Sequence, residues 1–469
     1  MRTLYKDLED NTELQEPGQF EVLSSVIMTK AGGVDVMPMI ESFNIYESIF
    51  KTFVTGNITL LDRVNFINTV NITGTEPITI EFRTKGSNHS VNVNLIVSKV
   101  KNKEKVNENI TRYTLSLVSP EFIKDSRTKI SRSFDGKYSE IVNTIYSTYL
   151  SSGVPLWLES TNNNNRVIIP NKSPIDAINM LAQFSLAETA DNANFLFFQT
   201  TKSFHFRSIS EMIYLDQVQS EGITFRAEKE QVSQEIPVVQ KATRAIEFEV
   251  KSDVDVLRHT ALGTYGASLI KHDIRSKSWR RSEFSYHDTF SFDSDKNFIK
   301  INEFPISPDG PVTEDNDNLS DFPESYVNMI SGAEEYQYQT QQNIPEFEKL
   351  DYENTILQRK SEMNSMNIQR AKLSIYGMSG IQAGDVVSMF VPLPDATSGL
   401  SGGHKAPDKK LSGKWLVESV AHQVTEKYYC ELSLIRDSIP IEQTPYTKLN
   451  YPDSTPKIIQ ASPMGSSNK

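Results

Sequence analysis

The sequence has a single cysteine, no long apolar segment and no excess of positive charge. One cysteine among 469 residues excludes an intramolecular disulfide and a cysteine-rich zinc site. No apolar run has the length that a membrane-spanning helix needs, and the charged N-terminus carries no hydrophobic stretch of the kind found in secretion signals. We therefore expect a soluble protein that is made in the cytoplasm and does not insert into a membrane.

The charge balance argues against a protein whose main function is to bind nucleic acid. Acidic residues outnumber basic residues by 60 to 48, and the net charge is -12. Binding to a phosphate backbone depends on an excess of lysine and arginine. We expect no sequence-specific binding of nucleic acid.

The usual signatures of catalysis and metal binding are also missing. The chain has no phosphate-binding G-x-x-x-x-G-K-[ST] loop, no G-x-S-x-G turn and no H-E-x-x-H motif. His272-Asp273 and His287-Asp288 are adjacent pairs, which in a strand would point to opposite faces. The acidic run around Asp315 and Asp317 lacks the glycine and the distal glutamate of a calcium loop. We therefore predict no catalytic residue, no cofactor and no metal ligand, and interpret the chain as a non-enzyme.

The residues that are abundant favour strands. The chain holds 24 Phe and 18 Tyr together with many Asn and Thr, and long Ala/Leu-rich stretches are few. A chain of this length exceeds the size of one hydrophobic core, so two to four domains are expected. The predicted fold class is mainly β, within the α+β class.

The stretch "SGKWLVESVAHQVTEKYYCELSLIRDS" near the C-terminal end holds the only cysteine. Its residues alternate in polarity on both sides of the polar "TEK" turn, which predicts a long hairpin. Cys430 falls on the apolar side of the second strand, and His422 has no second ligand or nucleophile at a recognisable offset. We interpret both residues as structural and not as a reactive centre.

A similar hairpin occurs near the other end of the chain. "LIVSKV", a polar turn and "RYTLSLVSP" match "WLVESVAHQV", a turn and "YYCELSLIRD". Upstream of them, "TGTEPITIEF" parallels "SGIQAGDVVSMFV". The sequence therefore predicts two related small β-barrels, one near each end.

The region between the two predicted barrels has a different hydrophobic pattern. Apolar residues at helical spacing predict helices within "GKYSEIVNTIYSTYL" and "NKSPIDAINMLAQFSLAE", the second with Ser173 as N-cap and Pro174 in its first turn. "NFLFFQTTKSFHFRS" predicts a hairpin on which these helices pack, and a long, mostly solvated helix is expected after Pro345.

The predicted domain boundaries follow from these changes in composition and hydrophobic pattern. In chain order they are an N-terminal extension (1–19), the first barrel (20–119), an α/β insertion (120–225), strands leading into the second barrel (226–300), a long loop and helix insertion (301–370), the remainder of the second barrel (371–440) and an extended tail (441–469).

Two clusters of basic residues stand out against the acidic total. Arg275, Lys277, Arg280 and Arg281 surround Trp279, while Lys99, Lys101, Lys103 and Lys105 alternate along one segment. Such mixtures can bind nucleic acid. An Arg-Trp cluster more often anchors a protein partner, which is the interpretation we favour here.

The segment from 371 to 437 resembles the second barrel of phage tail hub proteins. In that pattern a strand ends in glycine, a glycine-containing approach leads to the next strand, and a strand with histidine precedes a closing L-x-L-x-R strand. The matching positions are Gly377, Gly380, Ile381, Gly384, Asp385, Trp415, Val417, Val420, His422, Leu432, Leu434 and Arg436. The order of modules is similar to that of the baseplate hub of T-even-type contractile phages and of the hub part of type VI secretion spike proteins.

This resemblance implies a structural protein of the virion, located in the phage tail baseplate. It implies a homotrimer that adapts the hexameric tail tube to a trimeric central spike, with other baseplate proteins around it and an axial channel for DNA. The duplication supplies an independent reason, because three chains with two similar units present six units around an axis. The resemblance transfers no catalytic residue.

Two other functions are compatible with the sequence. Numerous carboxylates and long polar loops would suit a cell-wall hydrolase of the injection apparatus. Aromatic-rich β domains also occur in carbohydrate-binding tail proteins.

Overall fold

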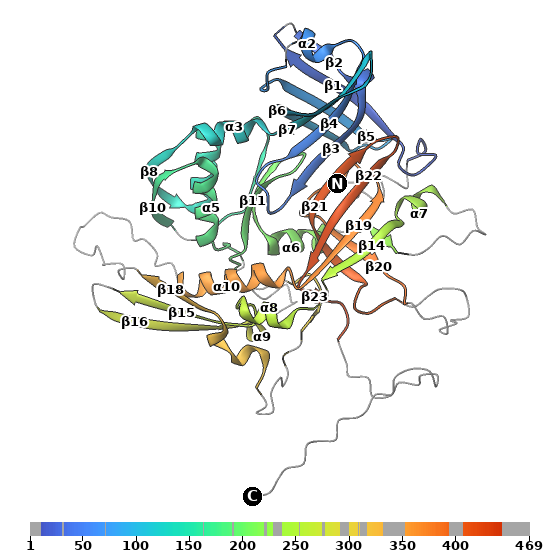
Figure 1. Ribbon diagram of the computed structural model, residues 1–469. Coiled ribbons are helices and arrows are strands. Elements are labelled where there is room, and N and C mark those ends of the chain that lie inside the picture. Colours follow the sequence, from blue (N-terminus) through green and yellow to red (C-terminus); the bar gives the residue numbers. More distant parts are fainter. Residues whose placement is uncertain are drawn as a thin grey trace, which may run out of the picture.

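The computed structural model describes residues 11–442 except 31, 71, 163, 190–191, 220–222, 228–236, 253, 274–276, 291–299, 308, 310–316, 332–351 and 394–406. The chain is mostly β, as predicted. One large sheet runs along the molecule, and smaller α/β elements are attached to it (Figure 1). Parts of the predicted long loop, the start of the predicted long helix and nearly all of the C-terminal tail lie outside the described residues.

Two units of six strands each build the large sheet. The first unit consists of β1 (Phe20–Thr29), β3 (Ile40–Ser48), β4 (Thr55–Asp62), β5 (Pro77–Thr84), β6 (Ser90–Asn107) and β7 (Ile110–Val118). The second unit consists of β13 (Thr224–Arg226), β14 (Ala245–Ser252), β19 (Gln369–Tyr376), β20 (Val386–Phe390), β21 (Gly413–Val424) and β22 (Tyr428–Arg436). The first unit also carries β2 (Gly32–Asp35), the 3-10 turn η1 (Met37–Met39) and α2 (Phe66–Thr69).

The two units have the same strand order in space and in sequence. Neighbouring strands follow the order β3-β4-β7-β6-β5-β1 in the first unit and β14-β19-β22-β21-β20-β13 in the second. Each strand thereby corresponds to the strand of the same rank in the other unit. The orientations differ at one place, because β1 pairs antiparallel with β5 whereas β13 pairs parallel with β20.

A shared irregularity supports this correspondence. The β6–β7 ladder shifts register between Val97 and Lys99, and the β21–β22 ladder shifts between Val417 and Ser419. These are the same positions of the two hairpins that the sequence aligns. A β-bulge adds one residue to one strand and sharpens its bend, so both hairpins bend at the same place.

The loops that lead into β5 and β20 also correspond. Val97 N donates to Glu76 O at 2.9 Å and accepts at its carbonyl from Thr75 N at 2.7 Å. Val417 repeats both bonds, with Asp385 O at 2.8 Å and Gly384 N at 2.9 Å. Thr75 and Gly384 both have positive φ, 105° and 94°. The left-handed backbone is therefore required at this position, and glycine adopts it without strain.

The sequence predicted two β-barrels, but among the described strands the sheet of neither unit closes into a barrel. In the large sheet, the described strands form an open path from β14 to β2, from which β20 and β13 branch off at β21. The two units join where β3 pairs with the part of β21 beyond its bulge. A single bridge between Arg226 and Arg244 links the first two strands of the second unit, short of a closed barrel. A common apolar core fills both units, which explains why the joined sheet is preferred over two separate ones.

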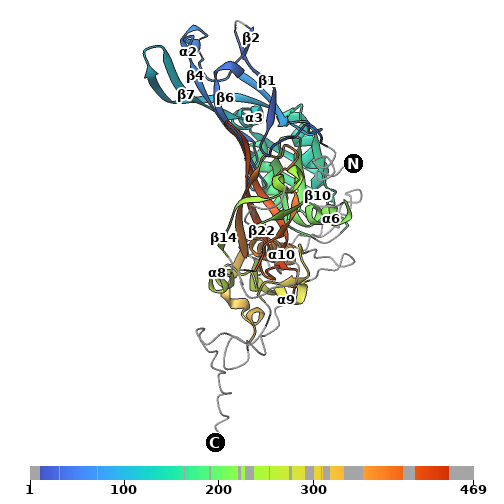
Figure 2. The ribbon, with the colours of Figure 1, turned by 90° about the vertical axis from the view of Figure 1, so that its right-hand side faces the viewer.

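The α/β insertion lies beside the sheet on one of its sides (Figures 1 and 2). It has its own aromatic core, and its predicted hairpin and helices are confirmed, including the bond from Asp176 N to the N-cap Ser173 Oγ at 3.2 Å. Its elements are α3 (Pro120–Arg127), β8 (Ile130–Lys137), α4 (Tyr138–Ile145), the π-helical turn η2 (Tyr146–Leu150), β9 (Leu156–Leu158), β10 (Asn164–Lys172), α5 (Pro174–Phe184), β11 (Phe195–Gln199), β12 (Phe204–Ser208) and α6 (Ile209–Gln219).

A third group of elements lies between β14 and β19 in the chain. Of the strands expected in 226–300, β14 joins the second unit, whereas β15 and β16 form a separate sheet with β18, a strand that the sequence did not indicate. The group contains α8 (Val256–Ala261), β15 (Gly266–Asp273), β16 (Ser278–Ser285), α9 (Tyr286–Thr289), β17 (Phe304–Pro305), η3 (Leu319–Asp321), η4 (Pro323–Ser325), β18 (Val327–Ser331) and α10 (Tyr352–Ser365); α7 (Val238–Ala242) precedes β14, and β23 (Ser438–Ile439) pairs with β17.

The expectation that the helix after Pro345 is mostly solvated is wrong for its described part. Leu357 is buried against Ala267 and Leu269 of β15. Ser361 Oγ donates to Thr264 O at 2.6 Å. Polar side chains of this helix form hydrogen bonds with neighbouring elements and are buried. Its polar composition therefore does not mean that it is exposed to solvent.

Candidate functional site

The joint between the two units is the feature that makes one sheet out of two. β3 pairs antiparallel with β21 over six residue pairs, from Ser48 with Ser419 to Phe43 with Val424. Ile49 N adds a bond to Glu418 O at 2.9 Å, directly at the bulge of β21. The part of β21 beyond its bulge therefore pairs with the other unit, while the part before it pairs with β20.

Glu47 is a buried carboxylate at this joint. Its side chain accepts from Ala383 N and from Thr201 N, each at 2.7 Å. Ala383 belongs to the loop before β20 and Thr201 to the β11–β12 turn, so one carboxyl group connects both units and the α/β insertion. Burial raises its pKa from 4.5 to about 7, although the two backbone donors favour the charged form.

We predict that Glu47 makes the stability of the protein depend on pH. Its folded pKa lies above its unfolded value, so the folded state holds more protons between these values and stability falls as pH rises from about 4.5 to about 7. From pH 5 to pH 8, the difference in unfolding free energy between wild type and Glu47→Gln should decrease by about 2 to 3 kcal/mol. Urea unfolding at both pH values measures this difference.

The control for this prediction is Ser48→Ala. Ser48 is the neighbouring buried residue on the same strand and does not titrate. Its effect on the unfolding free energy should be equal at both pH values. If Glu47→Gln behaves in the same way as Ser48→Ala, the carboxyl group does not carry the proton that we assign to it.

The cysteine and histidine of the terminal hairpin are structural. Both are fully buried, and His422 Nδ1 lies 2.6 Å from Tyr428 Oη and 3.5 Å from Cys430 Sγ. Burial raises the pKa of Cys430 to about 11 and lowers the pKa of His422 to about 3. A neutral thiol and a neutral imidazole are poor as nucleophile and proton carrier at neutral pH. The ring of Phe82 from the first unit packs against the ring of Tyr428, with 5.3 Å between the ring centroids. These buried residues therefore pack across the joint between the two units.

The glycine and aspartate positions of the hub pattern lie in the connection from β19 to β20. Gly377 has no room for a side chain, because a Cβ there would lie 2.0 Å from the ring of Tyr428. Gly380 is buried in the same turn. Gly384 has the positive φ described above, and Asp385 Oδ2 accepts from Gln382 N at 2.8 Å.

The remaining pattern positions lie on β21 and β22. Arg436 is fully buried, and its guanidinium lies 4.0 Å from the ring centroid of Trp415. Val417, Val420, Leu432 and Leu434 belong to the common core, as does Ile381. The pattern positions thus come together around the second unit and do not form one pocket.

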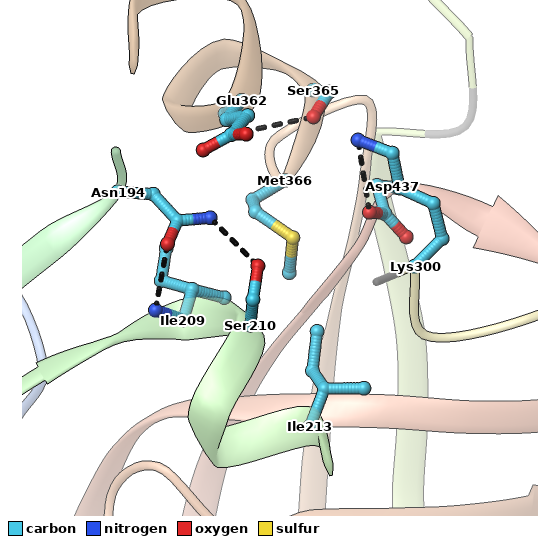
Figure 3. A pocket seen from close by; sticks show the side chains of 9 residues that line it. All are labelled: Asn194, Ile209, Ser210, Ile213, Lys300, Glu362, Ser365, Met366 and Asp437. Atoms are coloured by element: carbon cyan, nitrogen blue, oxygen red, sulfur yellow. Dashed lines mark hydrogen bonds and ion pairs between the residues drawn. The ribbon is translucent and has the colours of Figure 1, made fainter. Parts of the chain in front are cut away.

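A small enclosed cavity lies where α6, α10 and the end of β22 meet (Figure 3). Lys300 and Asp437 face each other across it at 4.0 Å, and burial raises the pKa of Glu362. The cavity measures about 10 Å³, which is room for about one water molecule. The charged cluster therefore ties the added elements to the second unit and has no space for a substrate.

Where the structure describes them, the sequence candidates for metal and partner binding do not come together in one site. Within the described ranges, no group of three His, Cys, Asp or Glu side chains could hold a metal ion. His287 contacts Ser307 O at 2.9 Å, and Asp315 and Arg275 lie outside the described residues. Trp279 is 70 % exposed on β16. Among the described helices, none combines the length and apolar character needed to cross a bilayer.

Comparison with known proteins gave matches among solved structures alone. No protein-family model and no curated protein matches the chain. The solved structures that it resembles include tail proteins and a component of the type VI secretion system.

Three of these structures illustrate the range of similarity. The tail protein from Neisseria meningitidis is 7 % identical, with a TM-score of 0.49 over 89 % of this chain and 97 % of that one. The 43 kDa tail protein of prophage MuSo2 from Shewanella oneidensis is 9 % identical, with a TM-score of 0.48 over 89 % and 99 %. A type VI secretion system component from E. coli is 8 % identical, with a TM-score of 0.39 over 89 % and 76 %.

The sequence analysis missed Glu47, although its position carries a signal. Phe43 and Ile45 in β3 and Ile49 directly after it share the parity of Glu47, and all three are buried. An acidic residue on the apolar side of a strand costs free energy unless it is hydrogen-bonded or neutralised. Such a residue therefore marks a place where backbone donors from elsewhere in the chain converge.

Proposed function

We propose that this chain is a structural hub protein of a phage tail baseplate or a related injection apparatus, and not an enzyme. Three copies form a ring in which six similar units surround an axial channel for DNA. One face of the ring fits a hexameric tail tube, and the other fits a trimeric central spike. The protein is made in the host cytoplasm and ends in the virion, where it also contacts other baseplate proteins.

The repeated six-strand order, with the same bulge in both hairpins, is the observation that carries this proposal. A trimer of identical chains has three equivalent positions, whereas a chain with two corresponding units provides six. The intrachain joint also supplies one contact between neighbouring units. If the same kind of contact recurs between chains, the six units follow one another in a ring.

Electron microscopy of the purified protein tests this function. We expect threefold particles with an axial hole, in which subunit contacts bury roughly 2,000 Å² or more, as in obligate assemblies. The sample should be imaged alone and with a candidate spike protein. Monomers in both samples would contradict the proposal. Clearing of peptidoglycan in a gel assay that one Asp or Glu substitution abolishes would contradict the non-enzymatic role.

A further inference from the structure

The intrachain joint can be used as a template for a contact between chains. In the joint, the second strand of the first unit, β3, pairs with the fifth strand of the second unit, β21, beyond its bulge. The corresponding strands are β14, the second strand of the second unit, and β6, the fifth strand of the first unit. Within one chain these two strands do not meet.

β6 has a free edge at the corresponding place. Before its bulge it pairs with β5, and the last bonds on that side are those of Val97. From Ser98 to Asn107 its ladder partner is β7 alone, and no described strand covers the other side. An uncovered edge presents backbone donors and acceptors that another strand can pair with.

β14 has the other free edge. It pairs with β19 and, among the described strands, ends the path of the large sheet (Figure 1). The register against β19 and β4 makes Phe248 correspond to Phe43, and Val250 to Ile45. β14 therefore carries apolar residues at the positions that β3 uses in the joint.

The burial of these corresponding residues differs. Phe43 and Ile45 are 1 % and 0 % exposed in the joint. Phe248 and Val250 are half-buried and line a cleft of about 690 Å³ along β14. The second unit thus leaves part of its apolar surface exposed along β14. The corresponding surface of the first unit, along β3, is covered in the joint.

The charges of the two free edges are opposite. β6 carries Lys99, Lys103 and Lys105, all exposed and without an ion pair to a described residue. β14 carries the exposed Glu247 and Glu249 and one exposed cation, Lys251, which forms an ion pair with Glu249. Lysines on an edge strand also discourage pairing with a like edge. Two β6 edges repel each other and so do two β14 edges, whereas one of each attracts.

We propose that β14 of one chain pairs with the free part of β6 of a second copy, repeating between chains the β3–β21 joint within the chain. This inference rests on the proposed ring and names the surfaces that build it. The contact is head-to-tail, because each chain offers one edge of each kind. Head-to-tail contacts close into a ring when the rotation between neighbours allows it.

A cross-linking experiment on the full-length protein tests the pairing. The native Cys430 is fully buried, so the double variant Glu249→Cys, Lys103→Cys presents two accessible thiols to a short bis-maleimide. We expect covalent dimers and trimers on denaturing gels. The control variant Glu249→Cys, Arg166→Cys keeps one thiol and moves the other to the exposed β10, and it should remain uncross-linked.

Charge exchange tests the same contact without added thiols. Glu247→Lys with Glu249→Lys should abolish the trimer in mass measurements, as should Lys99→Glu with Lys103→Glu. All four changes in one chain should restore it. All four residues are exposed, and circular dichroism verifies folding.

The outcomes separate this inference from the function on which it depends. Threefold rings that yield no more cross-links than the control, or that survive either charge reversal alone, overturn the β14–β6 contact and leave the ring. Monomers at every concentration, for wild type as well as variants, overturn both.

Discussion

A single methyl group at position 377 should cost the protein about 3 kcal/mol or more of unfolding free energy, at the upper end of what overpacking costs in protein cores. In Gly377→Ala, the new Cβ would lie 2.0 Å from Cγ of Tyr428. Tyr428 cannot turn away, because its ring packs on Phe82 and its hydroxyl bonds to His422 Nδ1. Urea unfolding, with tyrosine fluorescence and circular dichroism as probes, measures the loss.

The matched control is Gly153→Ala. A Cβ at Gly153 meets nothing within 4 Å, and its φ is not positive. This substitution should be neutral or should stabilise the protein by a few tenths of a kcal/mol, because alanine restricts the unfolded chain. Equal effects at both positions would contradict the tight contact of Gly377.

A double-mutant cycle identifies Tyr428 as the cause. Tyr428→Ala alone removes a buried ring and should destabilise the protein by roughly 3 to 5 kcal/mol. Combined with Gly377→Ala, it should cost clearly less than the sum of the two single losses, since the methyl group then has space. Additive losses would place the strain of Gly377→Ala elsewhere.

Local patterns predicted the hairpins and the helices of the insertion. The alternation around Tyr428 to Arg436 and the N-cap at Ser173 depend on neighbours within a few residues, and both are confirmed. Gly377 also appeared in the sequence as part of a pattern. Its reason, the ring of Tyr428 some fifty positions later, could be found only in the structure.

Contacts between distant segments were not predictable in the same way. The pairing of β3 with β21 joins residues that are far apart in the chain, and a strand pattern does not specify which edge will meet which. The same limit explains the prediction of closed barrels. It also explains the wrong expectation for α10. The sequence did not show that β15 lies against this helix and buries Leu357, so its polar composition suggested a solvated helix.

Replacing Arg436 should have the other large effect. Its side chain donates to Gln369 Oε1, to Lys410 O and, at 3.0 Å, to Ser412 O. Its guanidinium also stacks on Trp415. Arg436→Ala removes these three hydrogen bonds, two of them to the buried Gln369 and Ser412, and opens a cavity, so we expect a loss of about 4 kcal/mol in urea unfolding.

Arg370→Ala is the matched control, and Arg436→Lys separates charge from geometry. Arg370 lies on β19 of the same unit, but its side chain is 43 % exposed in an ion pair with Glu418, so its loss should cost less than about 1 kcal/mol. Lysine keeps the charge at 436 but cannot serve three acceptors with a planar fork, and we expect an intermediate loss. A lysine variant as stable as wild type would mean that charge alone is needed at the end of β22. An alanine variant no worse than Arg370→Ala would mean that the buried guanidinium does not hold β22 to the loop before β21.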